Sequence, residues 1–423
     1  MQIIIRSCLN NFLTKFREIL LDMKFSLLWK ILGSIALGIG MGFVMPVWGA
    51  RVFMTFNSIF SQFLGFLIPL IIIGFVAPAI SEVGTKAGKM LLLTVVLAYA
   101  STVGGGLFSY FVSDAAFPHL ISSRDSAELT ASLHDGMNLS PYFTVKIPAM
   151  MDVMTALVFS FLIGICMAYL KTPALQKVFG EFRDVVSMTI GRMIIPLLPI
   201  YIFGIFLEMT MKGEVADVLS AFAKIIGIIF AMHIVLLLAQ YCIAAVFVRK
   251  NPIKMLGTML PAYFTALGTQ SSAATIPVTL RQCVKMGVRE DIAGFTVPLC
   301  ATIHMAGSCM KITACALALM IMEGMPYSTP MFVGFICMLA ITMVAAPGVP
   351  GGCIMAALGV LSGMLGFSEA NQALMIALYI AMDSFGTACN VTGDGAISQI
   401  VNYFFADRIE TPADEKDAAL LTE

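Results

Sequence analysis

The sequence predicts an all-α polytopic membrane protein. Of its 423 residues, 59% are hydrophobic and only 12% are charged, and the mean hydropathy is +0.93. A composition this apolar excludes an ordinary soluble globular domain. The apolar residues also form runs long enough to cross a bilayer as helices, which satisfy their own backbone hydrogen bonds. The formal net charge is zero and no segment interleaves basic with aromatic residues, so we expect no nucleic-acid partner.

Eight apolar runs predict transmembrane helices. They cover residues 25–46, 52–82, 88–116, 150–170, 178–211, 217–248, 289–323 and 370–406. Residues 1–25 differ, because their apolar residues recur at helical spacing with charged residues between them. We therefore expect an interfacial amphipathic helix there. The polar residues 407–423 are expected to form a cytoplasmic tail.

Two further apolar segments are interrupted at their centres and predict helical hairpins. In 252–283 the interruption is the polar stretch 268–272, and in 330–365 it is the Gly- and Pro-rich stretch 347–352. Such a pair in matching positions is typical of a binding site made by re-entrant hairpins. Unwound backbone at membrane depth needs protein or a cavity around it. We therefore expect both hairpin tips to lie beside the polar part of the last span.

The distribution of positive charge predicts the orientation. If both hairpins enter the bilayer without crossing it, eight spans place both termini on one side. Most of the 25 Lys and Arg then fall on that side, and cytoplasmic loops are the ones that carry such an excess. We expect cytoplasmic termini in an inner (plasma) membrane. Hairpin 252–283 would then enter from the cytoplasm and hairpin 330–365 from outside.

The last span carries a stripe of polar side chains. Asp383, Thr387, Asn390 and Asp394 are spaced i, i+4, i+7 and i+11, so on a continuous helix they share one face. An ionisable side chain at the centre of a bilayer costs on the order of 2.5–3.5 kcal/mol, so such residues usually line a substrate or ion pathway. An interhelical hydrogen-bonding stripe is the alternative.

Three motifs carry a resemblance to a known family. They are QSSAATIPVTLR at 270–281, APGVPGG at 346–352 and FGTACNVTGD at 385–394. Their order and spacing resemble those of the dicarboxylate/amino acid:cation symporters, which include the glutamate transporter homologues, over most of the chain. The resemblance implies an elevator fold and a homotrimer. Spans 1, 2, 4 and 5 of residues 26–248 would form the scaffold, while spans 3 and 6 would move with the transport core 249–406.

The resemblance also implies a substrate site and sodium sites. Asp383 would hold a substrate ammonium group, while Asn390 and Ser272 would bind the α-carboxylate. The implied substrate residues are Ser271, Ser272, Ser308, Val349, Gly351, Cys353, Asp383, Gly386, Thr387 and Asn390. The implied sodium residues are Cys300, His304, Asn390 and Asp394 for one ion, and Thr302, Met343, Val344 and Ala346 for a second. No organic cofactor is expected.

Departures from the family pattern narrow the substrate. Members that carry acidic substrates have an arginine for the side-chain carboxylate, but this chain has Gly386 there, and Gln270 at the first hairpin tip. Without a fixed cation, and with extra room at Gly386, the expected substrate is a small neutral amino acid of the serine, threonine or alanine type. This resembles the serine/threonine sodium symporter branch. Dicarboxylates or acidic amino acids are the alternative.

Span 7 departs from the pattern as well. Ala306 stands where a sodium-binding carboxylate is expected, so we expect one or two sodium ions. His304, Ser308 and Lys311 lie at i, i+4 and i+7 and could face the same cavity as the stripe. Lys311 and His304 either take part in coupling or make structural pairs within a packed core. Protons are therefore the alternative driving ion.

These patterns favour secondary active symport over an enzymatic activity. The sequence offers no His/Cys/carboxylate cluster with metal-ligand spacing and no convincing nucleophile with a base. An uncoupled channel or a transport-like receptor is the alternative class.

Overall fold

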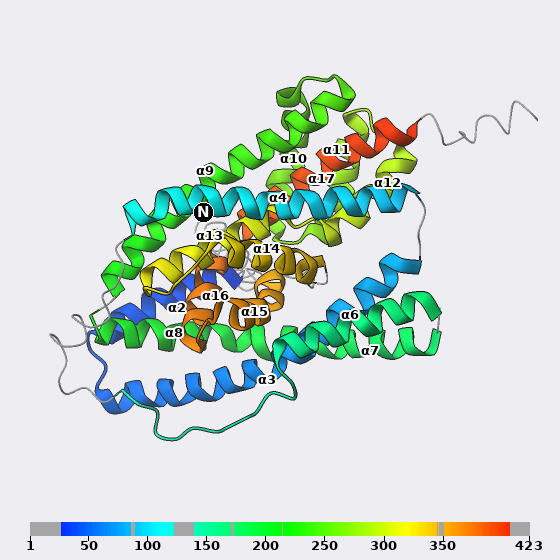
Figure 1. Ribbon diagram of the computed structural model, residues 1–423. Helices are drawn as coiled ribbons and strands as arrows, with labels where there is room; N and C mark the ends of the chain where they lie inside the picture. Colours follow the sequence, from blue (N-terminus) through cyan, green and yellow to red (C-terminus); the bar gives the residue numbers. More distant parts are fainter. Residues whose placement is uncertain are drawn as a thin grey trace, which may run out of the picture.

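The regular structure of the described chain is helical throughout (Figure 1). The computed structural model describes residues 27–85, 89–121, 139–170, 173–213, 215–344, 346 and 351–406. The predicted interfacial helix 1–25, the tail 407–423 and the expected substrate residue Val349 lie outside these ranges. Within them, the predicted all-α fold class is confirmed.

A helix or a run of helices lies at each of the eight predicted spans. They are α2 (Leu27–Gly42), α3 (Val47–Thr85), α4 (Lys89–Leu120), α6 (Val153–Leu170), α7 (Pro173–Thr189) with the π-helix η1 (Ile190–Ile194) and α8 (Ile195–Met211), α9 (Val215–Val248), α12 (Glu290–Ile303) with α13 (Ala306–Met322), and α16 (Glu369–Ala381) with α17 (Asp383–Phe405). Among the described residues, five segments are long and apolar enough to cross a membrane, and the bent pair α16–α17 would be a sixth. Shorter apolar stretches lie in α2 and α6. The helices support a multi-pass membrane protein, and the count of eight spans stays a prediction.

Each interrupted segment forms two helices that contact each other. α10 (Pro252–Thr269) and α11 (Ser272–Lys285) make the first pair, and α14 (Thr329–Val344) and α15 (Gly352–Leu365) make the second. Gln270 ends α10 in the left-handed region at φ 54°, and the Ser271 side chain then caps α11 by accepting from Ala274 N. Gly351 precedes α15 at φ 76°, which glycine adopts without strain. Whether either pair is re-entrant stays a prediction.

Two further breaks were not predicted. The segment 289–323 is interrupted at His304 and Met305, where His304 is extended. The expectation of one continuous helix over 370–406 is wrong, because α16 ends at Ala381 and α17 leaves at an angle of 62°. The polar stripe nevertheless lies wholly on α17. Neither break coincides with a glycine or proline, the residues that most often interrupt a helix.

The helices form two groups joined by a middle layer. α2, α3, α6, α7 and α8 lie on the lower side of Figure 1, where α3 contacts α6, α7 and α8. α4, α9–α13 and α17 lie on the other side and contact one another. α14, α15 and α16 lie between the groups: α14 and α15 contact α3, and α16 contacts α2, α8 and α13. The helices of the expected scaffold spans thus lie together, and relative movement of the two groups stays a prediction.

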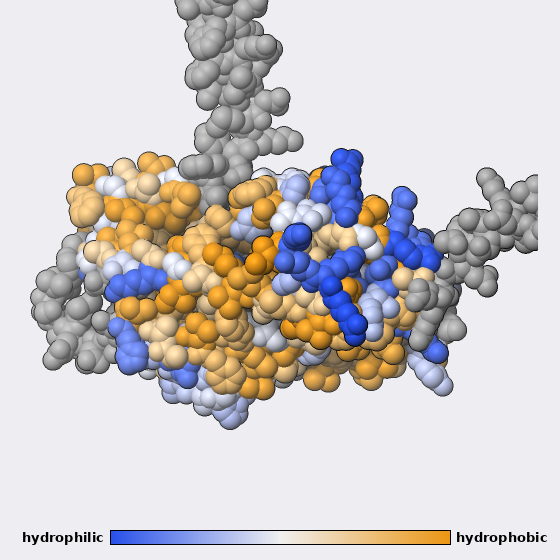
Figure 2. Space-filling view, turned by 90° about the horizontal axis from the view of Figure 1, so that it is seen from above, coloured by the Kyte–Doolittle hydropathy of each residue, from blue (hydrophilic) through white to orange (hydrophobic). Residues whose placement is uncertain are grey.

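Apolar side chains are exposed over much of the surface. They cover a large part of the face shown in Figure 2. Leu92 and Val96 of α4, Leu162 of α6 and Ile234 and Val246 of α9 are all exposed. Patches of this extent are rare on soluble monomers and are typical of surfaces that face lipid or another subunit. The surface therefore agrees with a membrane protein.

The backbones of α13 and α17 pack directly against each other at Gly307. A Cβ added there would lie 2.6 Å from Cys389 Cβ and 2.9 Å from Gly386 O. Small residues at such a point let two membrane helices approach closely. The contact fixes the register between the start of α13 and the polar stripe.

Replacing Gly307 with alanine should destabilise the protein, because a backbone oxygen cannot move aside. We expect a loss of about 1–3 kcal/mol, typical of overpacking, seen as a lower melting temperature in detergent. Gly294, on the exposed side of α12 with nothing within 4 Å of an added Cβ, is the matched control. Gly294→Ala should be neutral or stabilising by about 0.5–1 kcal/mol. Equal melting temperatures for the two variants would contradict the close contact.

Candidate functional site

Two polar stripes face each other across the contact between the α12–α13 segment and α17. The pairs are His304 with Asp394, Ser308 with Asn390, and Lys311 with Asp383. All six side chains are buried. Within the described chain, the 304, 308 and 311 positions therefore face the stripe, but through direct contacts and not across the shared cavity that the spacing predicted. His304 belongs to the extended link before α13 and not to the helix itself.

The Asp383 end of the stripe lies at the break between α16 and α17. Asp383 Oδ2 accepts a 2.8 Å hydrogen bond from Gly351 N, and Oδ1 lies 3.5 Å from Lys311 Nζ. The ammonium group also donates to Met382 O at 3.3 Å and Tyr379 O at 3.5 Å. Its nitrogen lies 3.4 Å from the centroid of the Tyr379 ring. Carbonyl oxygens at the negative end of the α16 dipole, the ring face and the carboxylate all favour a cation.

The structure corrects the expectation about Gly386. A Cβ added at Gly386 would lie 2.9 Å from Lys311 Nζ and 3.2 Å from Lys311 Cε. The predicted extra room is therefore filled by the lysine. The prediction that no fixed cation is present is also wrong, because α13 supplies one beside Gly386. Sequence comparison along α17 alone cannot detect a cation that another helix provides.

Asn390 holds the middle of the stripe by capping α13. Its Oδ1 accepts from Gly307 N at 2.8 Å and from Ser308 N at 3.2 Å. Its Nδ2 donates to Ser308 Oγ at 3.0 Å and to Met305 Sδ at 3.4 Å. Two of the N–H groups that the break at 304–305 leaves without helical partners are thereby satisfied. A substrate or sodium ion that binds to Asn390 would have to share its side-chain amide with the N-terminus of α13.

The other end of the stripe is a hydrogen-bonded network around His304. Its Nδ1 lies 2.8 Å from Asp394 Oδ1, and its Nε2 lies 3.0 Å from Ser101 Oγ of α4. Gln240 of α9 donates to Ser101 Oγ at 2.9 Å. A neutral imidazole that donates to Asp394 completes this network, and so does an imidazolium that also donates to Ser101. In the first case Asp394 keeps an uncompensated negative charge, which suits a cation.

Gly393 allows this network to form. A Cβ there would lie 2.6 Å from His304 Cε1 and 2.7 Å from Gln240 Oε1. Cys300 is buried one turn before His304 and accepts from His304 N through its carbonyl oxygen. Sodium, a hard cation, prefers oxygen ligands. The Asp394 carboxylate and backbone carbonyls therefore fit the ion better than the His304 ring or the Cys300 thiol.

Both hairpin tips reach the first turn of α17, as predicted. Gln270 Nε2 donates to Ser384 Oγ at 2.8 Å, and Gly351 N donates to the neighbouring Asp383. Ser272 is buried at the start of α11. The two tips therefore meet on adjacent residues of one helix.

Two other expected substrate residues make local contacts. The Cys353 thiol lies 3.9 Å from Met305 Sδ, which places α15 beside the start of α13. Thr387 Oγ1 donates to the Asp383 carbonyl within α17. Direct substrate contact by Cys353 or Thr387 stays a prediction.

The residues expected for a second sodium lie where α12 and α14 end. Met343 and Val344 form the last turn of α14, and Ala346 N donates back to Met343 O at 3.0 Å. Thr302 is exposed in the last turn of α12, a helix that contacts α14. Helix-end carbonyls of this kind suit a cation. The sodium role of these residues stays a prediction.

Sequence reasoning missed several polar residues of the site. Ser101 and Gln240 complete the His304 network, Ser384 receives the first hairpin, and Tyr379 covers the Lys311 ammonium. Tyr379 lies four residues before Asp383, which is a detectable spacing. Ser101 and Gln240 come from distant helices and carry no local signal.

Two cavities lie among the described residues, and one of them adjoins the His304 network. One of about 380 Å³ is lined by α4, α9 and α17, including Ser101, Gln240 and Gly393. Another of about 420 Å³ lies between α3, α8 and the start of α16. Neither is lined by Asp383 or Lys311. The space beside Asp383 is instead occupied by the Lys311 side chain.

The chain is similar to known amino-acid transporters. It is 25% identical over 386 residues to the serine/threonine transporter SstT of Acinetobacter baylyi, which covers 88% of this chain and 96% of that protein. The serine/threonine transporter SstT of Acinetobacter baumannii is 26% identical over the same length, covering 88% and 95%. An excitatory amino acid transporter of Caenorhabditis elegans is 27% identical over 296 residues, so the chain spans 58% of that relative.

The family match covers almost the whole described chain. A model of the sodium:dicarboxylate symporter family matches residues 27–404, which include all three motifs and the paired stripes. The resemblance noted in the sequence is confirmed. The chain belongs to the sodium:dicarboxylate symporter family.

Proposed function

We propose that the protein is a secondary active symporter of small neutral amino acids of the serine, threonine or alanine type, driven by one or two sodium ions. The observation that carries this proposal is the buried stripe from Asp383 to Asp394, with both hairpin tips at its first turn. A buried carboxylate at one end suits the ammonium group of an amino acid. The carboxylate at the other end suits a sodium ion carried with it.

The charge balance at Asp383, with the Lys311 ammonium as a fixed cation, supports a neutral substrate. Lys311 and Asp383 form a buried pair of opposite charges. A zwitterionic amino acid adds no net charge to this pair, whereas a dicarboxylate brings two negative charges into a buried site. The relatives from both Acinetobacter species are named as serine/threonine transporters, which supports the same substrate class.

An acidic amino acid or a dicarboxylate is the second candidate substrate. The Lys311 ammonium beside Gly386 favours it, because a cation at this point could contact a second carboxylate. The family description and the Caenorhabditis elegans relative agree with this class. Protons remain the alternative driving ion, because His304 and Asp394 are directly paired.

The proposed mechanism is elevator transport by a homotrimer with cytoplasmic termini. The grouping of helices supports it, since the helices of the expected scaffold lie together and contact the others mainly through α14–α16. In this proposal eight spans cross the membrane. The α10–α11 and α14–α15 pairs are re-entrant, and the second acts as the gate through its contact with Asp383.

Uptake into proteoliposomes tests the proposed function. Labelled serine, threonine and alanine should accumulate under an imposed sodium gradient, and aspartate and succinate should compete poorly. Accumulation that follows a pH gradient alone would assign the driving role to protons. Efficient uptake of aspartate or succinate would favour the second candidate, and uptake indifferent to both gradients would contradict coupled transport.

Asp383→Asn should abolish amino-acid uptake, because the amide cannot compensate the substrate ammonium or the buried Lys311. Initial rates in proteoliposomes measure this effect. Asp291→Asn removes an exposed carboxylate in the first turn of α12 and is the matched control, with rates expected at the wild-type level. Wild-type rates in Asp383→Asn would remove the ammonium-binding assignment.

Asp394→Asn should weaken the sodium dependence of uptake, because a charged oxygen ligand is lost. The half-saturating sodium concentration should rise about tenfold, the change that about 1.4 kcal/mol of lost binding produces. A sodium titration of initial rates, with the Asp291→Asn control, measures it. An unchanged sodium titration would contradict the sodium site at Asp394.

A further inference from the structure

Lys311 occupies the position at which a substrate ammonium group would meet Asp383. Its side chain is fully buried and carries its own ammonium to within 3.5 Å of the Asp383 carboxylate. The expected ligand of Asp383 is also an ammonium group on a carbon chain. Lysine and substrate thus offer the same chemical group to one carboxylate.

The break between α16 and α17 makes this point favourable for a cation. Tyr379 O and Met382 O lie in the last turn of α16 and at its end, where the helix dipole is negative. Backbone N–H groups of Met382, Phe385 and Gly386 also donate to these carbonyls, so the ammonium group shares their oxygens with the backbone. Asp383 is the first residue of α17. The ammonium group therefore lies between a helix C-terminus and a carboxylate.

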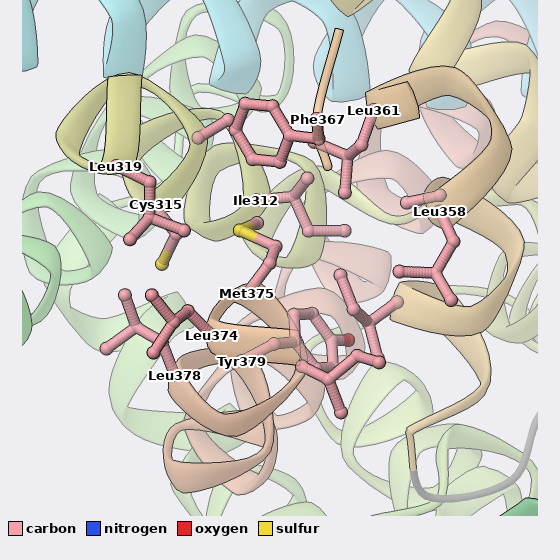
Figure 3. Close-up of a cluster of buried hydrophobic side chains, with 14 of the residues drawn as sticks. Ile312, Cys315, Leu319, Leu358, Leu361, Phe367, Leu374, Met375, Leu378 and Tyr379 are labelled. Carbon is pink, nitrogen blue, oxygen red and sulfur yellow. The ribbon is translucent and has the colours of Figure 1, made fainter. Parts of the chain in front are cut away.

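Packing around the lysine excludes water on the side of α13, α15 and α16. Figure 3 shows Tyr379 of α16 among apolar side chains that include Ile312 of α13 and Leu358 of α15. These side chains offer no polar partner for either charge. If an uncharged side chain replaced Lys311, the Gly351 N–H would be the strong partner left to Asp383 among the described residues. An unpaired carboxylate in such surroundings is strongly unfavourable.

The contact between Lys311 and Asp383 is also one that a ligand can replace. The Nζ–Oδ1 distance of 3.5 Å is longer than the 2.7–2.9 Å of a strong charge-assisted hydrogen bond. Two carbonyls and the Tyr379 ring remain as partners for the ammonium when the carboxylate is taken away. Asp383, by contrast, needs a cation, either the Lys311 ammonium or that of a ligand.

We propose that Lys311 is a tethered counter-ion, which neutralises Asp383 while the carrier is empty and gives up the carboxylate to the ammonium group of the substrate. The inference rests on the proposed function and deepens it. The empty transport core would then return through the membrane without an unpaired buried carboxylate. A ligand must bring its own ammonium group to displace the lysine, so amine-free carboxylates are excluded as substrates.

Lys311→Met tests the proposal, because methionine keeps most of the side-chain volume and removes the charge. Exchange of internal for external serine, which needs no return of the empty carrier, should continue near the wild-type rate. Net uptake into serine-free liposomes, which needs that return, should fall about a hundredfold. Serine should bind about tenfold more tightly, because its ammonium group no longer competes with the lysine.

Three results of this experiment separate a tethered counter-ion from other roles. Equal loss of exchange and net uptake, or weaker serine binding, would overturn the proposal, because Lys311 would then support the loaded site. Unchanged net uptake would overturn it as well. Thr313→Val, a buried change on the same helix, should alter neither rate. Wild-type protein that transports no amino acid would instead overturn the proposed function on which the inference rests.

A measurement on the wild-type protein keeps the proposal testable if Lys311→Met does not fold. 3-Hydroxypropanoate differs from L-serine only in that a hydrogen replaces the amino group. Serine should raise the melting temperature by linkage, and 3-hydroxypropanoate should not. Equal stabilisation by both compounds would show that a ligand binds without replacing the lysine and would contradict the proposal.

Discussion

Two carboxylates buried in the helical core each require a compensating group, and neighbouring helices supply one to each. Asp394 meets His304, Asp383 meets Lys311, and Asn390 caps α13 between them. These contacts hold the α12–α13 segment and α17 in a fixed register, helped by the direct backbone contact at Gly307. Because unpaired charge is costly in such surroundings, the same contacts decide what an incoming ligand has to replace.

The helix breaks connect this constraint to binding. The break at 304–305 leaves N–H groups at the start of α13 without helical partners, and the break at Met382 places carbonyl oxygens at the negative end of the α16 dipole. Asn390 accepts from Gly307 N and Ser308 N at the first break, and the Lys311 ammonium donates to carbonyl oxygens at the second. Both hairpin tips end at the first turn of α17. Binding chemistry is therefore concentrated where regular structure is interrupted.

Much of this arrangement could be predicted from the sequence, and the reasons for success and failure are physical. Long apolar runs identify helices, and Gly/Pro-rich or polar interruptions identify the two hairpins, because these signals are local. The spacing of the stripe also predicts one face of α17. The breaks at His304 and Met382 carry no such local signal, since no glycine or proline marks either of them. The spacing also predicts that Lys311 faces the stripe, but not that its ammonium group lies beside Gly386, because that contact depends on how α13 packs against α17.

The central claim is that the Asp383 carboxylate exchanges an internal ammonium group for that of a substrate. Structures of the protein in lipid, determined with and without L-serine, test it most directly. The account predicts Lys311 Nζ beside Asp383 in the ligand-free structure, and the serine ammonium in its place in the bound one. Serine bound elsewhere, with the Lys311–Asp383 contact unchanged, would contradict it.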